Sequence, residues 1–431
     1  MLSVLLLAFL AEGPAAAQTS VSLREAIRLS EQNSEAVKSA RHDSSAAALS
    51  YDAAKALRFP ALSLSATSFH INKLQSIDIP PISREIGVKD NYQADLRLSL
   101  PLFTGGQIAN RVGMQKETAL ALSQSVQVER LKNAYVTRRA CLELMIADTM
   151  LKSAQASSSR IEIIRGDVQN LYASGIADSV DILDAELAFH QASQTVAQKK
   201  TVRNNVSASL ARLIGVNSDD ELTLTEPVPI PVLTELEGPV SGLDQMDRPE
   251  LKVLNHRIGA AQRLIGLERA AGFPFLTGYT GYSVGKPNRD QFNQTWNDNF
   301  TVGISLTWEF NLGGRFIRSA QAAREEVFSA RFAKRELEES LILGAKVSWE
   351  NMRQAFDDFA ASQTEYDIAK RKFALAKEKR EAGQISVNRL LELEAELTAT
   401  EQLHFASMLG CYLCQADYLY AIGSSRIYGG L

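Results

Sequence analysis

Residues 92–106, YQADLRLSLPLFTGG, contain the change of pattern on which the fold depends. Up to Leu102, apolar and polar residues alternate, and this period of two predicts a strand with one apolar and one polar face. After the glycine pair that ends the stretch, apolar residues recur every three to four positions, and residues 107–174 contain no proline. A helix over about 107–174 would be roughly 100 Å long. Such a length requires a coiled-coil partner or a long assembly.

Composition and charge place the chain among folded, exported proteins. Its 431 residues are 45% apolar with a formal net charge of −4, which provides a core and lacks the basic footprint of nucleic-acid binding. Residues 1–17 begin with an apolar run and end in three alanines, which is typical of a signal peptide cut before Gln18. No run of eighteen apolar residues occurs, so we expect no transmembrane helix. The three cysteines do not suggest a disulfide framework.

The opening pattern occurs twice in the chain. A second alternating run, from Phe300 to Phe310, leads to Gly313-Gly314, as the first leads to Gly105-Gly106. Gly383 follows its glycine pair at the same distance as Gly175 follows the first pair. Both halves also contain a Phe-Pro step before their first strand, where proline ends a helix. We infer an internal duplication, in which two halves share one plan.

The predicted organisation has a signal peptide at 1–17 and a linker or equatorial belt at 215–248, rich in proline and acidic residues, between the two repeats. The first repeat covers 18–214, with strands at about 61–71 and 92–104, a loop around Pro80-Pro81 between them, a long helix at about 107–174 and a helix at about 178–214. The second covers 249–423, with strands at about 275–285 and 299–311, a long helix at about 315–382 and a helix at about 387–422. A short tail covers 424–431.

The two faces of the clear strands lead to a membrane hypothesis. About ten residues with one apolar and one polar face suit a transmembrane barrel strand, with lipid outside and water inside. The alternative is the edge of a soluble sandwich, which would need more strands per core. Four strands cannot close a barrel, and lipid does not tolerate open edges, so we expect a dimer with eight strands or a trimer with twelve. The side chains expected to face the barrel lumen are Gln93, Asp95, Arg97, Thr301, Ser305 and Glu309.

Several stretches together resemble one known family. They are PALSL at 60–64, LSLPLFTGG at 98–106, Gly175 with VDILDA at 180–185, Gly313-Gly314, and Gly383 with Leu390-Leu391. In their order, spacing and duplication, over nearly all of the mature chain, they resemble the TolC-like outer-membrane efflux proteins. These are the outer membrane factors of tripartite export systems.

The resemblance implies a mainly α fold with a transmembrane β-barrel portion. The chain would form a homotrimer in which long coiled-coil hairpins make an α-barrel tunnel and the strands make a twelve-stranded barrel. It would lie in the outer membrane of a Gram-negative type of envelope and conduct substrate passively, in an efflux or type I secretion system. Its partners would be a periplasmic adaptor (membrane fusion) protein and an inner-membrane transporter, with outer-membrane lipid around it and no cofactor, metal or nucleic acid.

A periplasmic or outer-membrane coiled-coil structural protein, or an adhesin, is the alternative to an export duct. A scaffold would fill its axis with apolar side chains, whereas a duct needs a polar inner face on each strand. The polar residues of the two strands therefore favour the duct. An enzyme has little support, because no phosphate-binding loop and no GxSxG nucleophile motif occurs in the sequence.

The resemblance also implies where the functional residues lie. Two helical turns, Gly175-Ile176-Ala177 and Gly383-Gln384-Ile385, would be farthest from the membrane and would meet the adaptor. The positions matching a ring of gate acids are Asp181 and Asp184 in the first half and Arg389 and Glu392 in the second. Arg389 departs from the acid that the family pattern has there, and an alternative role is to pair with Asp181 or Asp184 of a neighbouring chain. From the residues alone, Asp181 also suits the first turn of a helix capped by Asp178.

Three further motifs have structural as well as chemical interpretations. Glu401-x-x-His404 has the spacing of half a di-iron site, but the sequence has no second such pair, so we expect a surface or interhelical pair. Cys411-x-x-Cys414 likewise lacks a second cysteine pair for zinc and is interpreted as two small buried thiols. A cluster of arginines after the last strand would line the tunnel, bind lipid headgroups or form a solvated helix face; it consists of Arg315, Arg318 and Arg324.

Overall fold

The computed structural model of the chain describes residues 19–217, 222–225, 231, 242, 246–288, 295–310 and 312–429. The predicted signal peptide and most of the predicted linker lie outside these residues. The chain forms two compact units, each made from both halves of the sequence. Unit 1 contains Met1–Arg41, Val126–Pro249 and Leu337–Leu431, and unit 2 contains His42–Ser125 and Glu250–Glu336.

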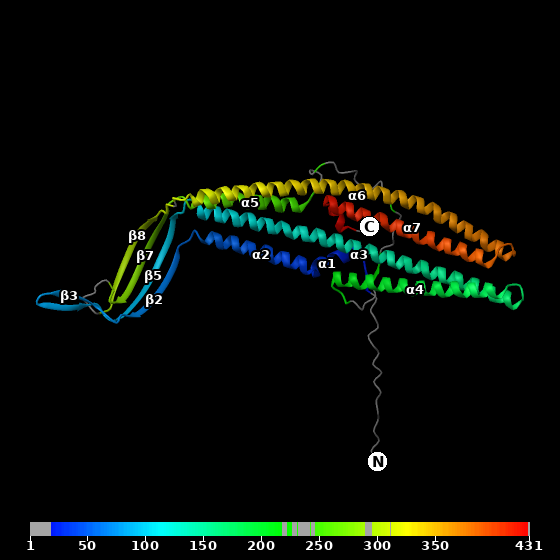
Figure 1. Cartoon of the computed structure of the whole chain (residues 1–431), viewed down its shortest axis with the longest axis horizontal. Coiled ribbons are helices and arrows are strands. Elements are labelled where there is room, and N and C mark those ends of the chain that lie inside the picture. Colours follow the sequence, from blue (N-terminus) through cyan, green and yellow to red (C-terminus); the bar gives the residue numbers. More distant parts are fainter. Residues whose placement is uncertain are drawn as a thin grey trace, which may run out of the picture. The chain divides into compact units, whose positions relative to one another are not determined.

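Unit 2 contains a four-stranded antiparallel sheet (Figure 1). Its strands, in spatial order, are β2 (Ala61–His70), β5 (Asp90–Phe103), β7 (Phe275–Lys286) and β8 (Asn297–Thr307). Each half of the sequence supplies two neighbouring strands, and pairing of β5 with β7 joins the halves. The edges of this sheet are therefore β2 and β8, one from each half.

Short strands also form where the sequence pattern does not predict them. A hairpin of β3 (Gln75–Ile79) and β4 (Ile82–Ile86) replaces the loop predicted around Pro80-Pro81. The two prolines occupy the turn between paired Ile79 and Ile82, where their missing N–H groups interrupt no ladder. In unit 1, β1 (Thr19–Val21) pairs in parallel with β6 (Leu222–Leu224), and strands of three residues are too short to show a period of two.

The helices follow the duplication in their lengths. The long helices α3 and α6 each contain 67 residues, and α4 and α7, which follow them, each contain 36. None of the helices in the described part of the chain combines the length and apolar character needed to cross a membrane. The bounds are α1 (Leu23–Asn33), α2 (Glu35–Ala56), α3 (Gln107–Ala173), α4 (Ser179–Ile214), α5 (Pro249–Ala270), α6 (Arg315–Glu381) and α7 (Val387–Ile422).

The glycine pair after β5 allows a close approach within unit 2. Gly105 has a φ of +59°, and a Cβ atom at this position would collide with the Cβ of Phe273. One turn further along, Asn110 of α3 occupies the space beside Gly266 of α5. The start of α3 therefore packs against the end of α5. In the sequence, α3 follows β5 and α5 precedes β7.

The core of unit 1 lies between its helices. One cluster joins α1, α3 and α4 with the short β1–β6 pair, and its central members include Ile27, Leu144, Leu210 and Leu222. A second cluster packs Ala345 and Met352 of α6 against Tyr418 of α7, and Met352 is fully buried. These two α6 residues are seven apart, the spacing of a coiled-coil seam.

Two glycine turns connect the helices of unit 1, and we call them the first tip (Gly175–Ala177) and the second tip (Gly383–Ile385). Gly175 has a φ of +76° and Gly383 a φ of +72°. After each glycine, the next N–H group bonds back to the helix, from Ile176 to the carbonyl of Leu171 at 2.9 Å and from Gln384 to that of Lys379 at 2.8 Å. This is the left-handed ending that glycine adopts without a steric penalty.

The same substitution should have opposite effects at two glycines of one helical hairpin. Gly175→Ala forces alanine into the left-handed region and should cost about 1 kcal/mol. Gly166→Ala lies inside α3, where no described atom is within 4 Å of the added Cβ, so helix propensity should stabilise it. Hydrogen–deuterium exchange should be about fivefold faster around residues 171–177 in Gly175→Ala. Equal or slower exchange there in Gly175→Ala, compared with Gly166→Ala, would contradict this account of the tip.

Candidate functional site

The sheet of unit 2 has one face that carries most of its polar side chains, and we call it the polar face. The strand register places Asp95 of β5 opposite Ser65 of β2 and Ser283 of β7. It also places Arg97 opposite Ser63 and Gly281, and Gly281 opposite Thr301 of β8. Because directly opposed residues of antiparallel strands point to the same side, the predicted residues Gln93, Asp95, Arg97, Thr301 and Ser305 share this face.

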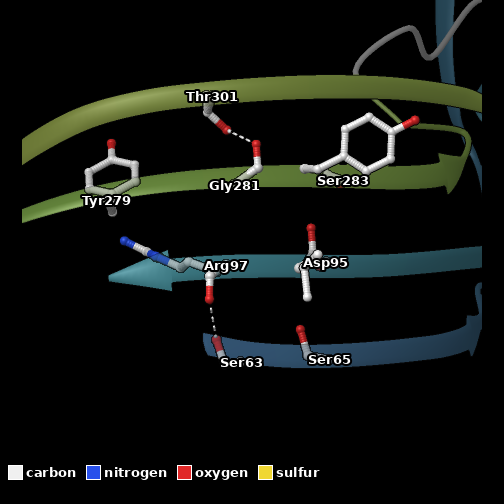
Figure 2. Close-up of a pocket in the computed structure, with 10 residues that line it drawn as sticks. Ser63, Ser65, Asp95, Arg97, Tyr279, Gly281, Ser283 and Thr301 are labelled. Atoms are coloured by element: carbon white, nitrogen blue, oxygen red, sulfur yellow. Dashed lines mark hydrogen bonds between the residues drawn. The ribbon is translucent and has the colours of Figure 1, made fainter. Parts of the chain in front are cut away.

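A shallow polar hollow of about 280 Å³ lies on this face (Figure 2). The guanidinium of Arg97 lies over the ring of Tyr279, 4.5 Å from its centroid. The amide of Gln93 donates to the Oδ1 of Asp95 at 3.0 Å. Neither charged side chain forms an ion pair with another described residue, so both charges depend on water. The face suits an aqueous surface and not a packed core.

The opposite face of the sheet is apolar and uncovered. Leu64 is 76% exposed, Val302 72% and Ile304 69%, although each lies within a regular strand. Aromatic pairs stand near both ends of β8: Trp296 stacks with Tyr92 at 6.1 Å, and Trp308 contacts Phe310 at 4.5 Å between centroids. An apolar band with aromatic residues at its two borders is the pattern of a lipid-facing strand surface.

Glu309 is the one predicted lumen residue that the sheet does not include. The strand predicted over 299–311 ends at Thr307, so Glu309 lies beyond the ladder. Just before it, Trp308 donates from Nε1 to the carbonyl of Gly272 at 3.2 Å. The pairing with β7 ends at Thr307, which lies opposite Phe275, the first residue of that strand. The alternation of residue types therefore continues in the sequence after the strand has ended.

The predicted gate residues lie on the first turns after the two tips. Asp178 caps α4 by accepting from the N–H groups of Val180 and Asp181, at 2.7 and 2.9 Å. Ser386 caps α7 in the same way, accepting from Arg389 at 3.2 Å. Asp184 is partly exposed one turn further along α4.

Arg389 forms its ion pair within its own helix. Its Nη1 lies 2.7 Å from the Oε2 of Glu392, and both side chains are more than half exposed. Within one chain, the cation therefore pairs with the neighbouring gate candidate and not with Asp181 or Asp184. A second arginine, Arg380 of α6, donates from Nη1 to the carbonyl of Ile385 at the second tip, at 2.9 Å.

The two tips belong to one packed cluster. Ile164 and Val168 of α3 and Ala185 of α4 meet Val387 and Leu390 of α7 there. Ile176 at the first tip is 74% exposed and takes no part in this core. The packing holds the two hairpins together. At the second tip Ile385 packs partly against this cluster, while Gly383 and Gln384 stay exposed.

The buried carboxylate of Glu394 links α3 and α7, and no sequence motif predicted this role. Glu394 is 2% exposed, and its Oε1 accepts from Ser157 at 2.9 Å, from the Nε of Arg160 at 3.1 Å and from Thr398 at 2.8 Å. Arg160 also donates to Thr398 at 2.9 Å and lies 3.5 Å from Glu401. This network is satisfied by groups from both hairpins, which is how a buried charge is tolerated.

Glu401 and His404 form no metal site in the described chain. Glu401 accepts from Ser153 of α3 at 2.9 Å, while the His404 ring stacks between Phe359 and Tyr366 of α6. Burial lowers the pKa of His404, which favours its neutral form. The expected interhelical role is thus observed for Glu401, and no group of three or more potential ligands is gathered among the described residues.

The thiols of Cys411 and Cys414 lie on α7 in its packed region. Cys411 is fully buried and donates to the carbonyl of Ala355 at 3.2 Å, whereas Cys414 is partly buried. Burial raises the pKa of Cys411 to about 12, so its thiol stays protonated at neutral pH. Protonated, enclosed thiols are packing groups and poor nucleophiles.

Comparison with protein families identifies the class of the chain. The family profile described as "Outer membrane efflux protein" matches residues 26–216 and 245–406. These segments include the described sheet, both tips and the Glu394 network. A search of the curated proteins found no match to this sequence.

Solved structures share the fold at low sequence identity. The chain resembles a membrane protein from Pseudomonas aeruginosa, with 19% identity, a TM-score of 0.79, and coverage of 96% of this chain and 98% of that one. It also resembles the CmeC outer membrane channel of Campylobacter jejuni, with 15% identity, a TM-score of 0.80, and coverage of 96% and 90%. The open state of the MtrE outer membrane channel of Neisseria gonorrhoeae matches with 17% identity, a TM-score of 0.73, and coverage of 93% and 88%.

Two glutamates of α7 should differ sharply in their effect on stability. Glu394→Gln removes the buried charge that holds Arg160, and we expect a loss of about 2 kcal/mol, less than for a fully enclosed pair because Arg160 is partly exposed and keeps Glu401. Glu392→Gln breaks only an exposed pair and should change stability little. Guanidinium unfolding followed by circular dichroism measures both. Equal midpoints for the two variants would show that the buried network is not a stabilising element.

Proposed function

The chain belongs to the outer membrane efflux protein family, and from this premise we propose that it is the outer-membrane duct of a tripartite efflux or type I secretion system. In this proposal the duct conducts substrate passively, and its partners are a periplasmic adaptor protein and an inner-membrane transporter. The observation that carries the proposal is the two-faced sheet, which exposes leucine and isoleucine on one side and Asp95 and Arg97 on the other. Lipid suits the first face, and a water-filled lumen suits the second.

The open edges of the sheet support a trimer. Edge strands β2 and β8 would leave backbone donors and acceptors unpaired in lipid, which is very costly. If β8 of one copy pairs with β2 of the next, three copies of four strands form a closed ring of twelve. The resemblance to the TolC-like outer-membrane efflux proteins implies a trimer, and the sheet described here has the two open edges that such closure needs.

Two helices of unit 1, α4 and α6, have exposed apolar stripes that could pack against other copies of the chain. Val180, Leu183 and Leu187 of α4 are each more than half exposed, at the spacing of one helical stripe. Ile368 and Leu375 of α6 are also more than half exposed and lie seven residues apart. Apolar stripes on both outer helices are suited to coiled-coil packing between copies, which would build the wall of a helical tunnel.

The tips are the proposed entrance and adaptor-docking region. The first tip presents the apolar side chain of Ile176, which is 74% exposed, and the second tip exposes Gly383 and Gln384. We assign the docking role to Gly175, Ile176 and Ala177 with Gly383, Gln384 and Ile385. Asp181, Asp184, Arg389 and Glu392, just beyond these turns, would face a common axis in a trimer.

The Arg389–Glu392 pair is the proposed gate element. Three copies around one axis would bring three cations and three carboxylates together, and the intrahelical pairs would reduce repulsion between like charges. Removing the cation would leave an acidic ring, which repels itself and attracts cations. The resting conductance of the entrance should therefore depend on Arg389.

Single-channel recording in planar bilayers tests both conduction and the gate. The wild-type protein should form channels, and Arg389→Glu should raise their conductance because acids then repel each other at the entrance. Glu392→Gln should weaken block by divalent or trivalent cations. Arg353→Glu, at an exposed i,i+3 pair elsewhere on α6, is the matched control and should leave both properties unchanged. Absence of channels from the wild-type protein would refute the duct, and unaltered conductance and block in the two gate variants would place the constriction elsewhere.

Export in cells that carry the complete system tests the tip. Ile176→Arg replaces an exposed apolar side chain with a charge, so the fold should persist while docking is lost. We expect at least a tenfold decrease in export, with an unchanged amount of assembled protein in the outer membrane. Bulky charged substitutions at Ala177 and Ile385 should act in the same direction. Normal export by Ile176→Arg would argue against a docking role for the first tip.

A further inference from the structure

A second hollow, of about 480 Å³, lies in unit 2 where the strands meet the helices. Its strand wall belongs to the polar face, because Ala61 is opposite Ser99, two residues from Arg97, and Thr277 is opposite Ser305. Its helix wall is formed by the end of α2 and the first turns of α3. All the residues that line it lie within unit 2.

The hollow combines an apolar lining with one positive charge. Phe59, Ile108 and Phe275 supply the apolar surface. The ring of Phe59 is 69% exposed, so much of this apolar surface is open to a ligand. Arg111 is the charged residue of the lining, and no carboxylate lies against it in the described part of the chain. Gln107 stands one helical turn before Arg111, on the same face of α3.

The electrostatics of the hollow favour an anion. None of its lining residues is acidic, and the first turn of α3 contains no acidic residue. The guanidinium of Arg111 and the amide of Gln107 can therefore both donate to a carboxylate or sulfonate. Such a ligand would give Arg111 the charge-assisted hydrogen bonds that no described residue provides. The positive end of the helix dipole adds to the same preference.

We propose that this hollow binds amphipathic organic anions on the inner surface of the duct. The acid group of the ligand bonds to Arg111 and Gln107, while its aromatic or aliphatic body covers Phe59, Phe275 and Ile108. The inference deepens the proposed function and rests on it, because the polar face is assigned there to the lumen. The volume is within the range of small-molecule sites, and an open site with one charge contact should bind weakly, with a Kd of roughly 0.1–1 mM.

Binding to the full-length protein in lipid nanodiscs tests the site without any transport measurement. The probe is 1-naphthalenesulfonate, followed by saturation-transfer NMR against empty nanodiscs. Arg111→Gln should weaken its binding at least tenfold, and Phe275→Ala several-fold. Arg318→Gln, an exposed arginine of α6 that does not line the hollow, is the matched control and should bind like the wild type. Methanesulfonate keeps the anionic group but lacks the aromatic body, and 1-naphthylmethylammonium keeps the aromatic body but carries a positive charge. Each should bind at least tenfold more weakly than 1-naphthalenesulfonate.

Equal binding of 1-naphthalenesulfonate by the wild type and Arg111→Gln, or no binding by either, would overturn the site. Equal binding of the sulfonate and the ammonium probe would also overturn it, because the lining would then not select charge. Single-channel current provides the transport readout: the sulfonate should reduce current through the wild type and not through Arg111→Gln. Channels that conduct but show no selective binding refute only this inference. Selective binding by a protein that forms no channels would instead refute the proposed duct and, with it, the lumenal placement of the site.

Discussion

The unpaired edges of the four-stranded sheet are the constraint on which the rest of the structure depends. Backbone N–H and C=O groups are strong hydrogen-bonding groups, and lipid offers them no partner. The sheet of unit 2 nevertheless has an exposed apolar face, with Leu64 and Val302 on its two edge strands. Lipid can therefore cover the apolar face of the sheet, but it cannot pair with the backbone groups at the edges of β2 and β8. Pairing between copies of the chain satisfies both requirements at once.

Unit 1 also has apolar surface that the single chain leaves exposed, here on helices. Its interior is closed by apolar clusters and by the Glu394 network, whereas its outer helices α4 and α6 keep exposed apolar stripes. The glycine turns reverse the chain so that each half contributes one hairpin. Within the sheet, β5 and β7 each pair with two strands, whereas β2 and β8, one from each half, pair with one.

The sequence was sufficient for the elements with strong periodicity. Alternation around Asp95 and Thr301 predicted strands whose polar residues share a face, and Gly175 and Gly383 predicted turns that require a left-handed backbone. The boundaries were less certain for a physical reason. Glu309 continues the alternation of residue types, but the partner strand β7 begins at Phe275, opposite Thr307, so the ladder between them ends there.

The remaining features depend on contacts between distant residues. Glu394 is indistinguishable from a solvated helix residue until Arg160 and Ser157 of α3 are known to face it. The hollow proposed to bind anions combines residues of α2, α3, β2, β5 and β7, which form no single motif in the sequence. The loop predicted around Pro80-Pro81 is instead the β3–β4 hairpin, in which the two prolines occupy the turn.

The number of chains in the detergent-solubilised protein tests the central claim most directly. Native mass spectrometry of the purified protein measures it as a multiple of the mass of one denatured chain, which for the 431-residue sequence is 47.3 kDa before removal of the predicted signal peptide. If the open edges of β2 and β8 are closed by other copies, the particle should contain three chains. A monodisperse monomer would contradict the account, because four strands with two free edges would then persist without the closure that we hold to be required.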